Sequence, residues 1–298
     1  MHKQAPLLPQ KKTAELLLTI PSFGWLLFFF TIPILILLTL SFKESSYDGN
    51  FIEGLSLQSF RILLEKSTLL ITWRTVWISS LTTLLSVLIS IPLAYTLAKL
   101  SKRVAQTVLL FIFIPTWSCF LVRIFAWKTL LHPDGFVKHL FVLLGFCSES
   151  TSLLYNDMAI LFAMLYSYST FALLPIYNAA SKFNFHLLDA AHDLGASRWT
   201  SIIKIFIPNI MHACRTGALL VLIPAAGAYV IPDLVGGAEA EMLGNKISQR
   251  IFFDRNIPEA CVLSLLLACV IILLAFFVNR TKNSSLHPPI PKQRRKNR

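Results

Sequence analysis

The sequence has few charged residues. Asp, Glu, Lys and Arg make up 14% of the 298 residues, against about 25% in soluble domains. Hydrophobic residues make up 55%, and 23 residues are phenylalanine. A soluble globular chain of this length would need more polar surface than this composition supplies. The composition therefore indicates a membrane protein that crosses the bilayer several times.

The sequence also lacks the motifs of several enzyme classes. It contains no GxxxxGK[ST] loop for ATP phosphates, no HExxH zinc motif and no CxxC pair. Its five cysteines are scattered, and only Cys147 lies in a clearly polar segment. We therefore expect no catalytic residues, no metal site and no cofactor in this chain, and we predict that it is not an enzyme.

Six apolar runs are long enough to cross the ~30 Å hydrocarbon core of a membrane as helices. The first run is not followed by a small-residue cleavage site, which predicts an uncleaved span and not a signal peptide. The expected fold class is an all-α membrane protein. It has a basic N-terminus at 1–15, a six-span transmembrane domain at 16–280 and a basic tail at 281–298 that we expect to be disordered. The expected spans are 16–40, 71–98, 107–131, 158–180, 208–231 and 260–278.

Lysine and arginine outside the spans are concentrated on one side of the predicted membrane. They lie in the N-terminus, the turn at 99–106, the segment at 181–205 and the tail. Because cytoplasmic loops carry such an excess, both termini and the segment at 181–205 are predicted to be cytoplasmic. Most acidic residues fall on the other side. The net charge of +12 thus follows the membrane topology, and we expect no nucleic-acid binding.

A polar segment at 181–208 separates the fourth and fifth spans. Asn184 can cap a short helix, and Gly195 can adopt the positive φ that ends it. Ser197 can cap a second short helix. The segment is therefore predicted to be a helix-turn-helix outside the membrane, with small alanines that allow a partner to approach closely.

These residues resemble the EAA signature of ABC importer permeases. The signature reads Glu-Ala-Ala, three residues, Gly, nine residues, and Ile-x-Leu-Pro. This chain keeps every spacing, with Asp189 in place of Glu and Ile207 in place of Leu. In the family, the segment forms coupling helices that dock into a groove on the ATPase subunit. The resemblance implies an ATPase-coupling role for Asp189, Ala190, Ala191, Leu194, Gly195, Ala196 and Pro208.

Further motifs lie along the spans: Ile114-Pro115-Thr116-Trp117, the stretches at 121–127 and 173–177, Ile231-Pro232-Asp233, and Gly244-Asn245. Through these residues the chain, from the first span to the sixth, is similar to the permease subunits of spermidine/putrescine ABC importers. His192, where the family often carries Arg, and the long basic tail depart from the pattern.

The resemblance implies a permease subunit in the bacterial inner (plasma) membrane that forms the translocation path for polyamines. The implied partners are an ATPase subunit dimer, a second homologous permease subunit, a periplasmic polyamine-binding protein and membrane lipid. ATP hydrolysis is expected in the separate ATPase subunit.

Arg123 is the clearest ionisable residue within an expected span. Such an arginine marks a pathway or a buried ion pair, or it extends its side chain to the membrane interface. Because a positive charge suits a cationic substrate poorly, a structural ion pair is favoured over a contact with the cargo.

Aromatic rings in or near the spans can bind ammonium groups by cation–π attraction, worth ~0.5–2 kcal/mol each, but they can equally belong to the lipid belt or to helix packing. Asp233 can attract a cation at the outer end of the fifth span, or it can simply end a helix. The substrate-path candidates are Trp117, Arg123, Trp127, Tyr168, Tyr229 and Asp233.

Two alternatives stay open. The chain could be an ABC permease for another small solute, such as an opine, ferric iron or an oxyanion. It could also be a secondary transporter that acts alone. The second alternative predicts ionisable residues deep in several spans, or inverted repeats, and the sequence offers only Arg123.

Overall fold

The computed structural model describes residues 10–45, 51–52, 54–145, 152–237 and 240–280. The described chain divides into two compact units, residues 1–65 with 247–266 and residues 66–246 with 267–298. Nearly all of its regular structure is helical, as the all-α prediction requires. Most of the predicted N-terminal segment and the predicted tail at 281–298 lie outside the described residues, and so does Cys147.

The first span is followed by a short folded loop within the first unit. The rings of Phe42 and Phe60 lie 5.3 Å apart between centroids, and the Ser59 hydroxyl donates to the Lys43 carbonyl at 2.9 Å. These contacts tie the end of the span to a 3₁₀ turn. The elements are α1 (Gln10–Ser41), the antiparallel strands β1 (Glu44–Ser45) and β2 (Phe51–Ile52), and η1 (Gln58–Leu64).

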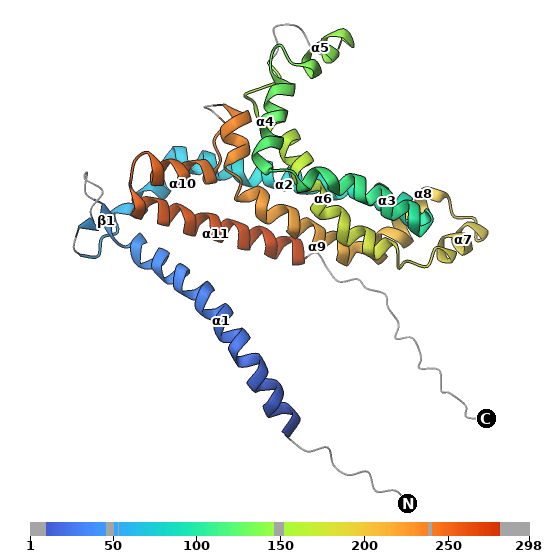
Figure 1. The fold of residues 1–298 in the computed structure, drawn as a ribbon, viewed down its shortest axis with the longest axis horizontal. Coiled ribbons are helices and arrows are strands. Elements are labelled where there is room, and N and C mark those ends of the chain that lie inside the picture. The colour runs from blue at the N-terminus through green and yellow to red at the C-terminus, as the bar shows by residue number, and fades with distance from the viewer. Residues whose placement is uncertain (1–9, 46–50, 53, 146–151, 238–239, 281–298) are drawn as a thin grey trace, which may run out of the picture. The chain divides into compact units, whose positions relative to one another are not determined.

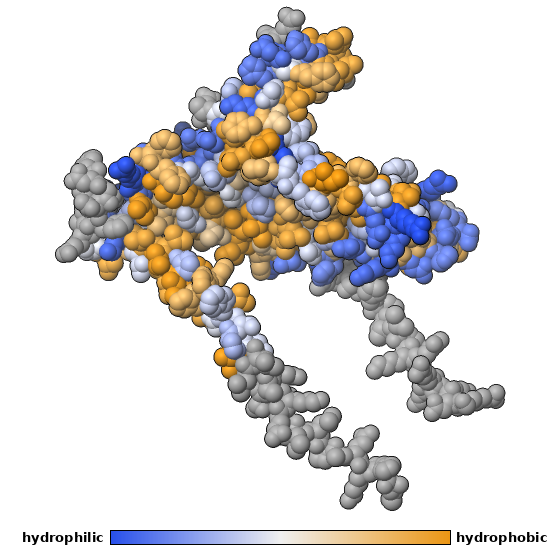
Figure 2. Space-filling view, in the orientation of Figure 1, coloured by the Kyte–Doolittle hydropathy of each residue, from blue (hydrophilic) through white to orange (hydrophobic). Residues whose placement is uncertain are grey.

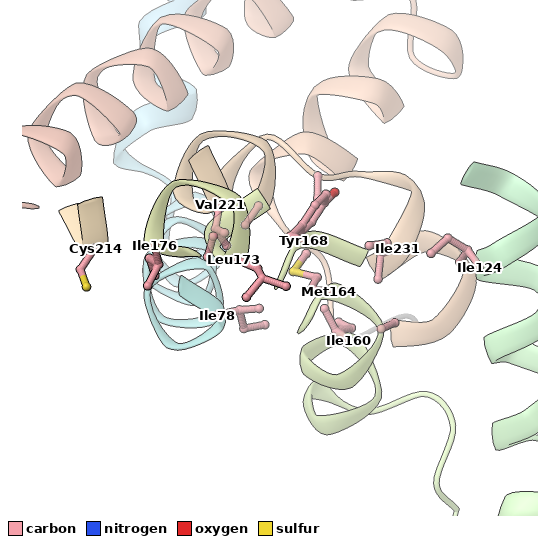
Figure 3. Close-up of a cluster of buried hydrophobic side chains, with 14 of the residues drawn as sticks. Ile78, Ile124, Ile160, Met164, Tyr168, Leu173, Ile176, Cys214, Val221 and Ile231 are labelled. Carbon is pink, nitrogen blue, oxygen red and sulfur yellow. The ribbon is translucent and has the colours of Figure 1, made fainter. Parts of the chain in front are cut away.

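Three long helices form the centre of the second unit: α2 (Lys66–Lys99), α6 (Asp157–Ala180) and α9 (Ile207–Ala226). Figure 1 shows them running side by side. In Figure 3, apolar side chains from all three helices, among them Ile78, Leu173 and Val221, point toward one another in the buried cluster.

The buried face of α2 is made largely of small hydroxyl residues. Several of these hydroxyls donate to carbonyls one turn earlier in the same helix, as in Thr75 to Ile71 at 2.8 Å and Thr83 to Ser79 at 2.7 Å. The Ser86 hydroxyl, by contrast, is buried without a hydrogen-bond partner among the described residues. Since lipid tails are as apolar as leucine, close packing of small residues is what holds such helices together. The buried hydroxyl residues of α2 are Thr68, Thr75, Ser79, Thr82, Thr83, Ser86 and Ser90.

The contact between α6 and α9 is also close. A Cβ atom on Gly217 would lie 3.0 Å from the carbonyl oxygen of Ala172. Gly217 is therefore required by the approach of the two backbones, and α2, α6 and α9 form one tightly packed group.

The third expected span is not one straight helix. It is built from α3 (Lys102–Phe113), the turn η2 (Ile114–Trp117) and α4 (Phe120–Leu131), and the helical segments on either side of the break are bent by 91°. Pro115 begins the turn, and Ser118 and Cys119 follow with extended ψ angles of 156° and 132°. A proline cannot donate the next helical hydrogen bond, and two extended residues redirect the chain. The prediction of a single helix over 107–131 was therefore wrong.

The fifth expected span begins earlier and ends earlier than predicted. A continuous helical stretch runs through α8 (Arg198–Ser201), the π-helical turn η3 (Ile202–Phe206) and α9, and it ends before Gly227. Pro208 has no N–H to donate within this helix. The neighbouring Asn209 side chain donates to the Ile205 carbonyl at 2.9 Å. The wider π turn accommodates the proline without breaking the helix. Pro208 therefore lies inside the helix and does not begin it.

Five helices in the described residues are long and apolar enough to cross a membrane, and a sixth is obtained if the bent third segment is one span. The boundaries of the remaining expected spans agree with helices to within a few residues. Two further helices lie where only loops were expected. They are α5 (Phe136–Leu143) and α10 (Leu243–Phe252), and the last span is α11 (Ile257–Arg280).

Candidate functional site

The segment between α6 and α8 forms the predicted helix-turn-helix. The first helix is α7 (His186–Asp193), and the Asn184 side chain accepts a hydrogen bond from the His186 N–H at 3.1 Å. Gly195 has φ +84°, and the Ala196 N–H donates to the Ala191 carbonyl at 2.9 Å. This is a Schellman ending, which needs the left-handed conformation that glycine adopts without strain. Ser197 then caps α8 by accepting from the Thr200 N–H at 3.2 Å. The two predicted short helices joined at Gly195 are confirmed, and their position outside the membrane stays a prediction.

The seven predicted coupling residues divide between a buried and an exposed set. Ala191 is buried, and Leu188 one turn earlier is 3% exposed, so this face of α7 holds the helix to the bundle. The opposite face is open, and Leu194 is 89% exposed. In Figure 2 the surface over α7 and α8 is mostly hydrophilic, with apolar residues set among polar ones. The exposed members are Asp189, Ala190, Leu194, Gly195 and Pro208, and Ala196 is half-buried.

Asp189 has one ion-pair partner in the described structure. Its Oδ2 lies 3.7 Å from His186 Nδ1, and the two side chains are 71% and 91% exposed. An exposed pair of this kind contributes about 0–1 kcal/mol to stability. The Asp189 carboxylate is therefore not needed to hold the fold and is accessible to a partner.

An aromatic cluster connects α7 to the bundle. We call it the aromatic anchor, and its members are Tyr95, Phe183, Phe185 and Phe206. Phe206 is fully buried at its centre, with ring centroids 5.1 Å from Tyr95 and 5.2 Å from Phe183, both edge to face. The Lys99 ammonium lies 4.3 Å from the Tyr95 ring centroid, a cation–π contact at the end of α2.

The aromatic anchor joins three elements that are distant in sequence. Tyr95 is in α2, Phe183 and Phe185 precede α7, and Phe206 lies in η3 just before α9. Ring contacts therefore link the start of α7 to α2, and a continuous helix links α8 to α9. These residues were not among the predicted site residues. The available signal was the placement of Phe183, Phe185 and Phe206 directly on either side of the coupling segment.

The substrate-path candidates do not form one site. Trp127 of α4 packs edge to face against Tyr166 of α6, with centroids 5.4 Å apart. Tyr168, which is 8% exposed, is close enough to Arg123 for an electrostatic interaction. These residues form one group where α4 meets α6, and Figure 3 shows Tyr168 among the side chains of the buried cluster.

Arg123 does not form the expected structural ion pair within the described part of the chain. Its guanidinium lies 5.7 Å from the Phe120 ring centroid, and its Nε is buried without a hydrogen-bond partner. The residue of α6 that interacts electrostatically with Arg123 is Tyr168, which carries a phenol and not a carboxylate. The ion pair is therefore not formed among the described residues and stays a prediction.

The other three candidates lie elsewhere. Trp117 is in η2 and is 80% exposed. Tyr229, which is 50% exposed, and Asp233, also exposed, lie in the short segment after α9, where the Asp233 N–H donates to the Tyr229 carbonyl at 3.1 Å. Tyr229 is not part of the fifth helix, because that helix ends at Ala226.

The segment that includes Gly244-Asn245 is fixed by several hydrogen bonds. The Asn245 amide donates to the Tyr229 carbonyl at 2.8 Å, and the Leu243 N–H donates to the Thr75 hydroxyl at 2.9 Å. Lys246 is 6% exposed, and its ammonium donates to the Thr68 hydroxyl at 2.7 Å. The burial of Lys246 was not predicted, because a lysine after Gly-Asn is typical of a solvated loop.

Among the described residues, no three His, Cys, Asp or Glu side chains come together as a possible metal site. What the described residues offer is therefore a bundle with an exposed helix-turn-helix at one end, and clusters of aromatic and charged side chains elsewhere.

Residues 86–282 match the family model described as the binding-protein-dependent transport system inner membrane component. This match covers more than half of the chain, and the chain belongs to that family. It is a multi-pass inner-membrane permease component.

The chain is similar to the spermidine/putrescine transport system permease protein PotB of Haemophilus influenzae. The two are 29% identical over 258 residues, which cover 87% of this chain and 90% of the relative. The fold of this chain is similar to that in the crystal structure of a bacterial ABC transporter involved in the import of the acidic polysaccharide alginate. The TM-score is 0.72, the identity 17%, and the match covers 91% of this chain and 95% of the other.

A second structure shows the bacterial alginate transporter in complex with an alginate pentasaccharide-bound periplasmic protein. It matches with a TM-score of 0.68 and 17% identity, over 91% of this chain and 94% of the other. At this identity both likenesses describe the fold and not the cargo.

Proposed function

We propose that this chain is a permease subunit of an ATP-driven importer and forms part of the translocation path for polyamines such as spermidine and putrescine. The observation that carries the proposal is the 29% identity to a spermidine/putrescine permease over almost the whole of both chains. The helix-turn-helix with the EAA spacing supports the importer class independently.

The proposed topology has both termini, α7 and α8 in the cytoplasm. The excess of lysine and arginine in those segments supports this orientation. The substrate would arrive from the periplasm on a polyamine-binding protein, as the complex of the alginate transporter with a periplasmic protein suggests by analogy. A second homologous permease subunit would complete the path, and the surrounding lipid would contact the apolar helix faces.

ATP would be bound and hydrolysed by a separate ATPase dimer, and this chain would carry no cofactor of its own. The exposed face of α7, with Asp189, Ala190 and Leu194, would dock on that dimer. A short helix with small residues can dock by close packing alone, and no catalytic residue of the permease is needed for this contact.

Closure of the ATPase dimer would displace α7. The aromatic anchor would pass that displacement to α2, and the continuous helix from Arg198 to Ala226 would pass it to the fifth span. Since α2, α6 and α9 pack closely through small residues, we expect them to move as a group. The bent third segment would then move relative to this group and change the access to the path.

The proposal is tested by the ATPase activity of the complete importer in liposomes. The assay compares spermidine, putrescine, sulfate and an amino acid mixture, each with the binding protein present. Stimulation by the polyamines alone is the expected result. A complex that hydrolyses ATP without any polyamine response would refute the cargo, and failure of this chain to assemble with any ATPase would refute the importer class.

A further inference from the structure

A cleft of about 520 Å³ lies in the second unit, where α2 and α6 begin and the segment before α10 passes. Its walls include two tryptophans of α2, an arginine, two carboxylates and a hydroxyl. The residues that carry the argument are Ser67, Trp73, Arg74, Trp77, Asp157 and Glu241. None of the path candidates from the sequence lines this cleft.

The two tryptophans form a pair on one face of α2. Trp73 and Trp77 are four residues apart in a helix, which places their side chains side by side. Both are accessible, with 69% and 56% exposure. Indole faces attract organic cations more strongly than the faces of other aromatic side chains do. A flexible cation with several ammonium groups could therefore contact both rings at once.

The lining of the cleft has a net negative charge, because it contains two carboxylates and one arginine. Asp157 lies 3.6 Å from Arg74, a loose ion pair. Glu241 has no ion pair or hydrogen bond with any described residue. Lys246 lies behind this wall, with its ammonium bonded to the hydroxyls of Ser67 and Thr68. On the cleft surface itself, one cation faces two carboxylates, and one of those carboxylates is available to a ligand.

We infer that this cleft is a binding site for a polyamine on the side from which the substrate enters. This inference rests on the proposed function and its topology, which puts the beginning of α2 and α6 on the periplasmic side. Glu241 pairs with one ammonium group, and Trp73 and Trp77 cover the alkyl stem and a second ammonium group. Arg74 limits the affinity by repulsion, so the cargo can leave the cleft toward the path.

The test is equilibrium binding of radiolabelled spermidine to the complete importer in nanodiscs, without nucleotide and without the binding protein. Glu241→Gln removes one exposed charge pair and is expected to raise the Kd about 3- to 5-fold. Trp77→Leu is expected to raise it about 2- to 30-fold. Arg74→Gln removes the repulsion and is expected to lower the Kd. Arg74→Gln is expected to change the Kd in the opposite direction to the other two variants. This difference separates a charge effect from general damage to the fold, which would raise the Kd in all three.

Two matched controls come from other parts of the chain. Asp134→Asn removes a carboxylate that is 91% exposed, and Trp25→Leu removes a tryptophan that is 66% exposed. Both are expected to bind spermidine as the wild type does. The inference is overturned if Glu241→Gln and Trp77→Leu match these controls.

Parallel measurements separate this inference from the proposed function. If the wild-type ATPase activity responds to polyamine but the cleft variants bind it normally, only the cleft is refuted. If the wild type shows no polyamine response, the proposed function and the cleft fail together. If the variants alter the dependence of activity on phosphatidylethanolamine and leave the spermidine Kd unchanged, the cleft holds a lipid headgroup and the inference is also overturned.

Discussion

Replacing Phe206 by leucine removes the central ring of the aromatic anchor and keeps an apolar side chain in its place. Phe206 is fully buried and makes two edge-to-face contacts, with Tyr95 at 5.1 Å and Phe183 at 5.2 Å. Such a contact contributes about 0.5–1.5 kcal/mol beyond the buried area. Losing both therefore costs about 1–3 kcal/mol, which an inserted membrane helix bundle should survive.

The expected result is an importer that assembles and hydrolyses ATP but moves less substrate for each ATP consumed. The physical reason is that Phe206 joins the end of α2 to the turn before α9, so a looser anchor lets α7 move without moving both helices. The measurement is the ratio of spermidine uptake to ATP hydrolysis in proteoliposomes. The melting temperature of the purified complex is recorded alongside it.

Phe111→Leu is the matched control, because Phe111 is 67% exposed on α3 and does not belong to the anchor. It should leave both the ratio and the melting temperature unchanged. If Phe206→Leu also leaves the ratio unchanged, the anchor does not transmit the movement of α7. If the melting temperature falls while the ratio of uptake to ATP hydrolysis stays at the wild-type value, Phe206 contributes only to stability.

Three further predictions concern the turn at Gly195, the hydrogen bond of Asn245 and the exposed pair of Asp189 and His186. Gly195→Val forces a β-branched residue into φ +84°, at about 1–2 kcal/mol, although no atom lies within 4 Å of the new Cβ. ATPase activity should persist while uptake falls, and Gly195→Asn should be milder because asparagine tolerates this conformation. Asn245→Leu removes the 2.8 Å bond to the Tyr229 carbonyl and should destabilise the protein by about 1–3 kcal/mol, measured by thermal unfolding. Asp189→Asn should change the free energy of unfolding by less than about 1 kcal/mol, because the pair of Asp189 with His186 is exposed. A loss of uptake in this variant at an unchanged melting temperature would therefore report the contact with the ATPase.

The parts of the fold that the sequence predicted correctly are those decided by local chemistry. A long apolar run becomes a helix in a membrane, because only a helix satisfies the backbone hydrogen bonds of a segment within the segment itself. The turn of the coupling segment was predictable for a similar reason. Gly195 and Ser197 each satisfy a helix end with residues only a few positions away.

The features that the sequence did not predict depend on contacts between distant segments, or on which of several possible backbone conformations a residue adopts. Pro115 signals a kink, but the 91° bend also needs the extended conformations of Ser118 and Cys119, which are ordinary residues. The anchor joins Tyr95 to Phe206 across more than a hundred residues. A sequence read in order gives no indication that these rings meet.

In the candidate site, too, some residues could be found from the local sequence, and others only from contacts in the folded protein. The coupling residues follow a spacing that the sequence displays, whereas the cleft depends on the approach of Glu241 to Trp73 and Trp77 in three dimensions. Arg123 was noticed as an ionisable residue in a span, but the identity of its neighbours on α6 could only come from the fold.

The most direct test of the proposed function is the accumulation of radiolabelled spermidine in proteoliposomes that hold the complete importer. The measurement supplies ATP on the side of α7 and the loaded binding protein on the opposite side. The account predicts accumulation above the external concentration that requires both ATP and the binding protein. Accumulation that is the same without ATP, or ATP hydrolysis without any spermidine entering, would contradict it.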